Sequence, residues 1–551
     1  MSKRASGILM PVFSLPGKYG IGCMSDEARR FADFLAEAGQ RYWQILPVGP
    51  TGFGDSPYQS FSTFAGNPYF IDPEELIRRG FLTEDDCAGL LAPVSAAASA
   101  GSAATVTEKT GHGSGKNKKG KKQKKSDKHK KKDGSGRDAA PVFDYVDYGF
   151  QYQHRFSVLR KAYGKWKNSG EKEQFDDFVR ANENWLRDYA LFMALKDPFG
   201  GASFTEWDDD IRYREPAALE RWTRELGDEI GFYEFLQYEF DREWKDLKAY
   251  VNQRGIEIIG DIPIYVSADS ADFWANPSLF QVDDANVPTA VAGCPPDGFA
   301  ADGQLWGNPL YNWDKMDENH YTWWISRIRK CRELYDVIRI DHFRGFDEYF
   351  SVKNGETTAR NGVWKKGPGM KLFRAIKEAL GDIPIIAEDL GYITPSVRQL
   401  VKDSGYPNMK VLEFAFDSRD SSGSEQYKPY HYGRNCIVYT GTHDNETIVG
   451  WLDSILPEEK QMLKDYLATD SDDPERIADL MIRAAEGSVA DTCVIPMQDW
   501  LGLDDRARTN HPSTTGTNWR WRMNAGSDSR ELAARIYKVT KTYGRLAAGR
   551  V

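Results

Sequence analysis

The chain has 551 residues, a net charge of −10 and 40% hydrophobic side chains. That length and apolar content suit several small domains or one large barrel that carries insertions. The negative charge argues against a general nucleic-acid-binding or anionic-membrane surface. Aromatic residues make up 13% of the chain, which suits sugar binding and an aromatic-rich core equally well.

The cysteine pattern and the N-terminal segment indicate where in the cell the protein is expected to be located. The chain has 6 cysteines, which form neither a C-x-x-C pair nor the spacing of a metal site. Scattered cysteines of this kind are typical of a reducing cytoplasm, so we expect a cytoplasmic protein. The first apolar run is too short for a signal peptide, and no run of about 18 apolar residues predicts a membrane span.

Short apolar runs alternate with amphipathic helical stretches, such as 26–38 and 370–380, along most of the chain. This βαβ pattern with eight apolar runs predicts an α/β fold, a (β/α)8 TIM barrel. A doubly wound open sheet is the alternative, but no glycine-rich phosphate motif follows a strand. The predicted strands are 8–13, 42–48, 256–266, 337–340, 383–387, 410–416, 436–439 and 492–496.

The gap after the second predicted strand, 51–255, is too long for one βα connection. Helical patterns at 145–166, 171–196 and 215–252 predict that it holds a mostly helical inserted subdomain region. We expect this region to interrupt a single catalytic barrel domain that spans 1–551.

Within that gap, the segment 95–140 is composed mainly of Ala, Ser, Gly and Lys. It contains 12 Lys and 1 Arg against 1 Glu and 3 Asp, and it has no aromatic residue. Such a segment cannot bury enough apolar area to offset the entropy of ordering, so we expect a disordered loop. The loop is either a solvated insertion without a role in the chemistry or a weak contact for nucleic acid and other acidic partners.

Three acidic clusters stand directly after predicted strands four, five and seven, and they contain Asp341, Glu388 and Asp444. The C-terminal ends of barrel strands converge on one mouth, where carboxylates are typical of catalytic sites. In a simpler interpretation each acid only caps the following helix. Three such clusters on one barrel favour the catalytic interpretation.

Two carboxyls with different protonation states suit the cleavage of a glycosidic bond. In retaining enzymes they lie roughly 5–5.5 Å apart, a separation that neighbouring strands can supply. Arg339 precedes Asp341 in the same run, and a nearby guanidinium favours the ionised carboxylate that a nucleophile requires. Glu388 needs a raised pKa to act as acid and then as base. Asp444 and His443 are suited to hold sugar hydroxyls and to stabilise a cationic transition state.

His342, next to Asp341, has an alternative interpretation as a metal ligand. Histidine nitrogens are common metal ligands, but the other candidate ligands do not share a spacing that is typical of metal sites. We therefore predict that the site contains no metal.

Four further motifs lie outside the acidic clusters. Segment 45–62 reads I-L-P-V-G-P-T-G-F-G-D-S-P-Y-Q-S-F-S, and segment 294–311 reads C-P-P-D-G-F-A-A-D-G-Q-L-W-G-N-P-L-Y. Segment 497–503 reads M-Q-D-W-L-G-L, and N-W-R-W-R follows at 518–522. Together with the acidic clusters, these motifs resemble those of the 4-α-glucanotransferases called amylomaltases or disproportionating enzymes, glycoside hydrolase family 77 of the α-amylase clan. The resemblance covers nearly the whole chain except 95–140.

The resemblance implies that Asp341 is the nucleophile, Glu388 the acid/base and Asp444 the transition-state stabiliser. It implies that a segment of an α-1,4-glucan (a maltooligosaccharide, glycogen or starch) passes to a new 4-hydroxyl on glucose or another glucan. It also implies that no metal or organic cofactor takes part. The residues that it implies for the sugar subsites are Tyr58, Ser56, Asp297, Phe299, Trp306, Asn308, Arg339 and His443.

The segment 295–306 is predicted to be a loop that leads to the fourth strand, and the resemblance implies that it forms a lid over the cleft. A lid that excludes water favours transfer to a sugar over hydrolysis. Gly298 stands where some relatives carry an aromatic residue. This difference leaves Phe299 as the expected aromatic residue of the lid.

Two other functions remain open at this level. The first is an amylase-type hydrolase, because the same covalent chemistry serves both reactions and only the acceptor differs. The second is a non-catalytic glucan-binding or RNA-tethered scaffold that uses the Lys-rich segment. The set of Asp341, Glu388 and Asp444 argues against a scaffold.

Overall fold

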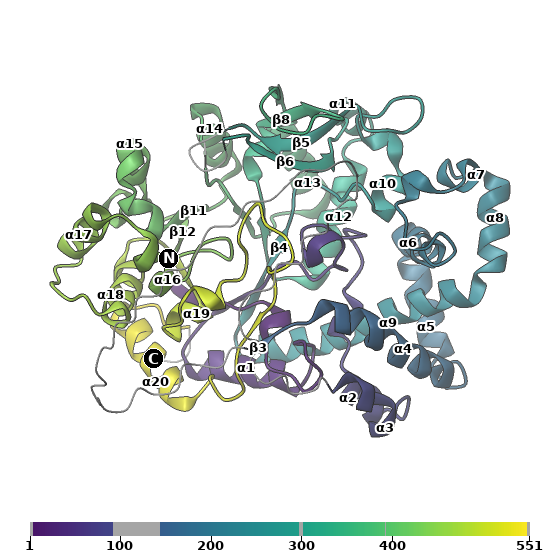
Figure 1. The fold of residues 1–551 in the computed structure, drawn as a ribbon, viewed down its shortest axis with the longest axis horizontal. Coiled ribbons are helices and arrows are strands. Elements are labelled where there is room, and N and C mark those ends of the chain that lie inside the picture. Colours follow the sequence, from purple (N-terminus) through teal and green to yellow (C-terminus); the bar gives the residue numbers. More distant parts are fainter. Residues whose placement is uncertain (1–3, 92–143, 297–300, 392, 548–551) are drawn as a thin grey trace, which may run out of the picture.

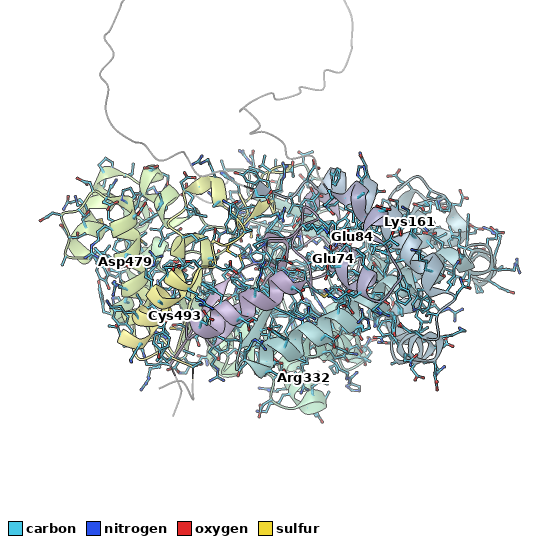
Figure 2. All side chains as sticks on the ribbon, turned by 90° about the horizontal axis from the view of Figure 1, so that it is seen from below. Glu74, Glu84, Lys161, Arg332, Asp479 and Cys493 are labelled. Carbon is cyan, nitrogen blue, oxygen red and sulfur yellow. The ribbon has the colours of Figure 1, made fainter. Side chains whose placement is uncertain are left out.

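The computed structural model describes residues 4–91, 144–296, 301–391 and 393–547 (Figure 1). The predicted disordered segment 95–140 lies outside these residues, as do Asp297, Gly298 and Phe299. Figure 2 shows the side chains on the ribbon, with Glu74, Glu84 and Lys161 on one side of the molecule and Asp479 on the other.

Eight parallel strands form a closed barrel in the order β1-β2-β4-β7-β10-β11-β12-β13, and β13 pairs with β1. Each of the eight predicted runs contributes one strand, so the predicted (β/α)8 barrel is confirmed. The strands are β1 (Ala5–Leu9), β2 (Tyr42–Gln44), β4 (Glu257–Ile262), β7 (Val337–Ile340), β10 (Ile385–Ala387), β11 (Asn408–Val411), β12 (Cys436–Tyr439) and β13 (Thr492–Pro496).

Four predicted runs continue past the ends of their strands, and in two of them a 3-10 turn follows the strand. In the run 8–13, the strand ends at Leu9, and Pro11, which has no backbone N–H to donate to a neighbouring strand, precedes the 3-10 turn Val12–Ser14. In the run 410–416, the strand ends at Val411 and the 3-10 turn Leu412–Phe416 follows. Most residues of both turns are buried, so an apolar run alone does not show where the strand stops.

Helices surround the barrel, and α20 at the C-terminal end packs against α1. The predicted helix 370–380 is confirmed as α13, and 26–38 is confirmed as α1 with its last residue outside the helix. The helices outside the long insertion are α1 (Asp26–Glu37), α10 (Ala271–Ala275), α11 (Trp313–Glu318), α12 (Thr322–Leu334), α13 (Met370–Leu380), α14 (Pro395–Ser404), α15 (Ser421–Ser424), α16 (Ile448–Ser454), α17 (Pro457–Tyr466), α18 (Pro474–Gly487), α19 (Met497–Trp500) and α20 (Arg530–Thr542).

The insertion between β2 and β4 is largely helical, as the sequence predicts, and many of its helices lie to one side of the barrel (Figure 1). Its short strand β3 (Asp144–Tyr145) pairs with β14 (Trp521–Arg522) near the other end of the chain. Its helices are α2 (Pro73–Arg78), α3 (Glu84–Cys87), α4 (Tyr148–Trp166), α5 (Lys172–Ala181), α6 (Glu183–Lys196), α7 (Asp209–Arg212), α8 (Pro216–Glu225) and α9 (Gly227–Gln253).

A four-stranded antiparallel sheet, absent from the predicted elements, lies beside the barrel at the top of Figure 1. Its order is β6-β5-β8-β9, and the hairpin of β5 and β6 contains part of the predicted loop 295–306. That prediction was therefore wrong for residues 304–306, which belong to β6. The strands are β5 (Ala290–Cys294), β6 (Gln304–Pro309), β8 (Glu348–Lys353) and β9 (Val363–Lys366).

Two sequence-based expectations concern membrane-spanning segments and the state of the cysteines. No helix within the described ranges is both long enough and apolar enough to cross a membrane. All six cysteines are described, and all are free thiols.

Candidate active site

The barrel brings Asp341 and Glu388 to the same end of neighbouring strands. Ile340 at the end of β7 pairs in register with Ala387 at the end of β10. The next residue of each strand is one of the two acids, so both leave the sheet side by side. Asp444 lies in the loop after β12. Burial raises the pKa of the Asp341 carboxyl, and the carboxyls of Glu388 and Asp444 raise it as well.

The Glu388 carboxylate is held by backbone donors. Its Oε2 accepts a hydrogen bond of 2.7 Å from the His342 amide, and its Oε1 accepts one of 2.7 Å from the Leu390 amide. Burial raises the pKa of Glu388, while Arg339 and the two amides act in the opposite direction. The raised pKa matches the requirement for an acid that is protonated before the reaction.

Arg339 on β7 contacts two acids at once. Its Nη1 donates to Asp261 of β4, and its Nη2 lies 3.1 Å from Oδ1 of Asp341. The predicted pairing of Arg339 with Asp341 is therefore present. Arg339 and Asp261 are buried, whereas the Asp341 side chain keeps 30% of its surface exposed and remains accessible from the mouth.

The ion pair with Arg339 does not by itself determine the ionisation of Asp341. Burial raises the pKa of Asp341, Arg339 lowers it, and the neighbouring carboxyls of Glu388, Asp261 and Asp444 raise it again. The net shift is upward, opposite to the effect expected from the guanidinium alone, because burial and like charges outweigh one cation. A positive charge that develops on a bound molecule would be stabilised by this group of acids.

Asp444 is oriented by residues from a distant part of the chain. Asn510 Nδ2 donates to Asp444 Oδ1 at 2.6 Å, and Arg508 Nη2 donates to the Asp444 carbonyl at 2.7 Å. His443 Nε2 lies 3.4 Å from Asp444 Oδ2. Burial lowers the pKa of His443, which favours its neutral form.

Tyr58, in the loop after β2, contacts both Asp261 on β4 and His443 in the loop after β12. Its hydroxyl donates to Asp261 Oδ2 at 2.8 Å and lies 2.9 Å from His443 Nε2. Because the Tyr58 proton points to Asp261, we assign the proton of His443 to Nε2, so that it donates to Tyr58. The Tyr58 ring also stacks on the His443 ring at 5.3 Å. Its packing on His443 and its two hydrogen bonds hold Tyr58 in place at the site.

The remaining sugar-subsite candidates occupy the loop after β2 and the antiparallel sheet. Ser56 Oγ accepts a hydrogen bond from the Tyr58 amide at 3.2 Å. Asn308 Nδ2 donates to the Val266 carbonyl at 2.7 Å, which fixes its amide group. The Trp306 ring on β6 meets the His342 ring edge-on at 4.8 Å. Two other subsite candidates, Asp297 and Phe299, lie outside the described residues.

His342 adopts a left-handed backbone conformation with φ of 53° and has a half-buried side chain. Burial lowers its pKa to about 3, so the imidazole is neutral. In the described part of the chain, no group of three or more His, Cys, Asp or Glu side chains is arranged to hold a metal ion.

Several site residues are not identified by the sequence reasoning. Asp261 lies inside a predicted strand and was not singled out. An acid within the apolar run I-I-G-D-I does, however, indicate a buried carboxyl that needs a partner. Asn510 and Trp519 lie in the C-terminal segment, and only folding brings them to His443 and Asp444.

Comparison with known proteins identifies the family. A family model described as 4-alpha-glucanotransferase, glycoside hydrolase family 77, matches residues 10–528. The chain belongs to the 4-alpha-glucanotransferase family. The resemblance drawn from the sequence motifs is therefore confirmed.

Relatives in this family match over almost the full length. The 4-alpha-glucanotransferase of Clostridium butyricum is 43% identical over 538 residues, which cover 97% of this chain and 100% of that protein. The chloroplastic/amyloplastic 4-alpha-glucanotransferase of Solanum tuberosum is 37% identical over 99% of this chain and 87% of its own length. The solved amylomaltase of Streptococcus agalactiae in complex with acarbose has a TM-score of 0.86 and 40% identity, covering 98% of this chain and 100% of that one.

We predict that the substitution Tyr58→Phe destabilises this member of the 4-alpha-glucanotransferase family. The change removes the hydroxyl that serves Asp261 and His443, and an interaction of this kind contributes about 1–2 kcal/mol. Thermal unfolding should show a lower midpoint. The matched control is Tyr152→Phe, because the Tyr152 side chain is 69% exposed. Equal midpoints for the two variants would contradict the role given to the Tyr58 hydroxyl.

Proposed function

We propose that the protein is a 4-α-glucanotransferase that cuts an α-1,4 bond of a glucan and forms a new α-1,4 bond on another sugar. The observation that carries this proposal is the pair Asp341 and Glu388 at the ends of adjacent barrel strands, in a chain of this family. Donors and acceptors are α-1,4-glucans such as maltooligosaccharides, glycogen or starch, and glucose also serves as an acceptor. The acarbose complex of the Streptococcus agalactiae amylomaltase supports this substrate class.

In the first half of the proposed reaction, Glu388 donates its proton to the glycosidic oxygen of the leaving sugar. The ionised Asp341 carboxylate attacks the anomeric carbon, so a glycosyl ester forms as the glycosidic bond breaks. The net pKa shift of Asp341 is upward, but Arg339, 3.1 Å away, opposes it, and protonation of Glu388 removes one of the negative charges that raise it; both effects favour the ionised form that attacks. Asp444 stabilises the positive charge that develops on the sugar ring.

In the second half, the deprotonated Glu388 takes the proton of an incoming 4-hydroxyl. The acceptor oxygen attacks the anomeric carbon, Asp341 leaves as a carboxylate, and the new bond has the same stereochemistry as the old one. Two displacements at one carbon therefore give net retention. All proton transfers use Glu388, so each turnover restores the initial protonation of both acids.

The sugar subsites follow from the positions around these acids. We assign Tyr58, Ser56, Arg339 and His443 to the sugar that reacts. Trp306, whose ring keeps part of its surface exposed on β6, is suited to stack on a sugar face. The other residues assigned to sugar binding are Asn308, Asp297 and Phe299.

Transfer in place of hydrolysis requires that a sugar, and not water, reaches the glycosyl ester. The names of the family and its relatives support transfer and do not favour the amylase-type alternative. We propose that the β5–β6 hairpin and the connection between its strands exclude water from the mouth. A non-catalytic scaffold is not supported by a site with all three acids.

The organisation of the chain and its location are also part of the proposal. We propose a single catalytic unit over 1–551, in which 51–255 is an inserted helical region. A cytoplasmic location remains a prediction from the scattered cysteines. Weak contact of 95–140 with nucleic acid also remains a prediction.

The first functional prediction concerns the products formed from maltotriose. Transfer should yield glucose together with glucans longer than maltotriose, because the cleaved segment passes to another maltotriose. The variant Asp341→Asn should lose this activity by a factor of about 10⁴ or more, because the glycosyl ester cannot form. Chromatography of the products at early times measures both outcomes.

The control for this experiment is Asp453→Asn, an exposed position on α16, which should keep wild-type transfer. Near-normal turnover of Asp341→Asn would show that Asp341 is not the nucleophile. Only shorter sugars from the wild type would indicate a hydrolase.

The second functional prediction concerns pH. The pKa of Glu388 is raised in the folded protein, and the acid is effective only while it is protonated. Transfer from maltotriose should therefore fall as pH rises through that pKa. α-Glucosyl fluoride has a leaving group that needs no proton, so release of fluoride should not fall in the same pH range. The same alkaline decline for both donors would contradict the acid role of Glu388.

A further inference from the structure

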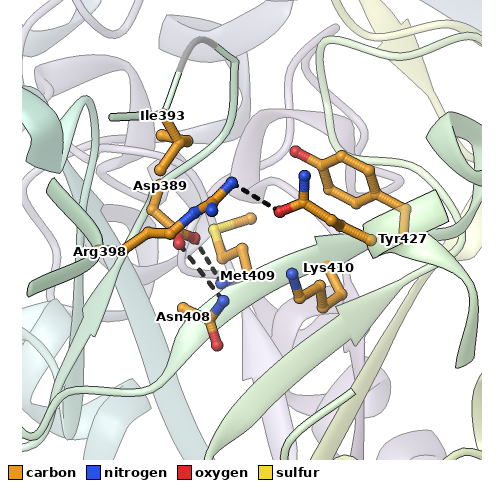
Figure 3. A pocket seen from close by; sticks show the side chains of 8 residues that line it. Asp389, Ile393, Arg398, Asn408, Met409, Lys410 and Tyr427 are labelled. Carbon is orange, nitrogen blue, oxygen red and sulfur yellow. Dashed lines mark hydrogen bonds between the residues drawn. The ribbon is translucent and has the colours of Figure 1, made fainter. Parts of the chain in front are cut away.

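A polar cavity of about 240 Å³ lies on the outer side of β10 and β11, between these strands, α14 and the 3-10 turn Glu425–Tyr427 (Figure 3). This volume has room for about eight water molecules. Its lining residues are Asp389, Ile393, Arg398, Asn408, Met409, Lys410, Gln426 and Tyr427.

The cavity is distinct from the mouth of the barrel, although Glu388 and Asp389 are neighbours in sequence. The Glu388 carboxylate turns to the His342 amide, whereas Asp389 accepts hydrogen bonds from the Met409 amide at 3.0 Å and from Asn408 Nδ2 at 3.3 Å. The Met409 sulfur faces the barrel interior, where Arg339 Nε lies 3.4 Å away. Because side chains alternate along a strand, Lys410 points outward to the cavity.

Lys410 brings a positive charge to the cavity without a negative partner in contact. The side chain is half-buried, and among the described residues neither a hydrogen bond nor an ion pair within 4.0 Å joins its Nζ. The Lys410 Nζ lies over the face of the Tyr427 ring, 5.3 Å from the ring centroid. Burial lowers the pKa of Lys410, which is the direction expected for an ammonium that has lost water without gaining a close anion.

Arg398 on α14 adds a second cation to the same cavity. Its Nη2 donates to Gln426 Oε1 at 2.8 Å, which is a neutral acceptor, and no ion pair joins it to a described carboxylate. Arg398 lowers the pKa of Lys410 further, so the two cations repel each other. Asp389 attracts Lys410 from a distance, but its oxygens are already used by Met409 and Asn408.

Two cations share this cavity, and no carboxylate in the described part of the chain contacts either of them. An oxyanion would complete this arrangement. We propose that this cavity binds a phosphate group, either the free ion or a small phosphate monoester, with Lys410 and Arg398 as its cationic partners. Phosphate at neutral pH carries between one and two negative charges. The Asp389 carboxyl also lines the cavity, but its oxygens accept hydrogen bonds from Met409 and Asn408, and with two cations the lining remains net positive. Arginine suits the planar, two-point recognition of phosphate oxygens, and lysine acts as a point charge.

The direct test is calorimetric titration of the full chain with inorganic phosphate and, in a second arm, with glycerol phosphate. Chloride keeps the ionic strength constant, and glycerol is the uncharged counterpart. We expect saturable binding of one equivalent. Lys410→Met and Arg398→Gln should each weaken it about tenfold or more, because each removes a charge-assisted contact. Lys538→Gln, an exposed position on α20, should bind like the wild type.

The two arms distinguish the source of the phosphate. Tighter binding of glycerol phosphate supports a monoester as the ligand, and equal or tighter binding of inorganic phosphate supports the free ion. Absence of saturable binding, unchanged affinity in Lys410→Met, or equal binding of glycerol would overturn the proposal.

A second measurement separates binding from a purely structural role. In chloride buffer, Lys410→Met should unfold at the same temperature as the wild type or higher, because it removes a half-buried charge without a contacting partner. Added phosphate should then raise the unfolding midpoint of the wild type more than that of the variant. A variant that unfolds at a lower temperature in chloride would show that Lys410 supports the fold, which contradicts the proposal.

Discussion

The arrangement of acids at the mouth of the barrel depends on the buried guanidinium of Arg339, which contacts both Asp261 and Asp341. Arg339 donates to Asp261 and lies 3.1 Å from Asp341, and the carboxyls of Glu388, Asp261 and Asp444 all act on Asp341. Without this cation the acids would repel one another in surroundings that screen charge poorly. With it, the group remains rich in negative charge, and such a site stabilises a sugar ring that becomes positive as its bond breaks.

The other contacts restrict how these groups can move. Tyr58 joins Asp261 to His443, and Asn510 orients the carboxylate of Asp444. These residues come from four well-separated segments of the chain, so the site exists only when the whole barrel has closed. Catalytic groups that are held in place before the substrate binds need little rearrangement during the reaction, and this lowers its barrier.

The barrel and its three acids could be predicted because parallel strands are buried on both faces and appear as continuous apolar runs. The strand direction then placed Asp341, Glu388 and Asp444 at one end. The antiparallel sheet was missed because none of its strands is a continuous run of large apolar residues: β5 (A-V-A-G-C) is rich in small residues, and β6 (Q-L-W-G-N-P) and β8 (E-Y-F-S-V-K) contain polar ones. Asn510 could not be predicted as a partner of Asp444, because the two residues are 66 positions apart and no local sequence pattern indicates that they are in contact.

The central claim is that Asp341 forms a covalent bond to the sugar while Glu388 handles the proton. The most direct test treats the variant Glu388→Gln with α-glucosyl fluoride and analyses its peptides by mass spectrometry. The fluoride needs no acid to leave, and without the base the glycosyl ester should accumulate. We predict one glucosyl group on the peptide that contains Asp341 and none in a Glu388→Gln, Asp341→Asn double variant. A glucosyl group on another residue, or fluoride release without any adduct, would contradict this account.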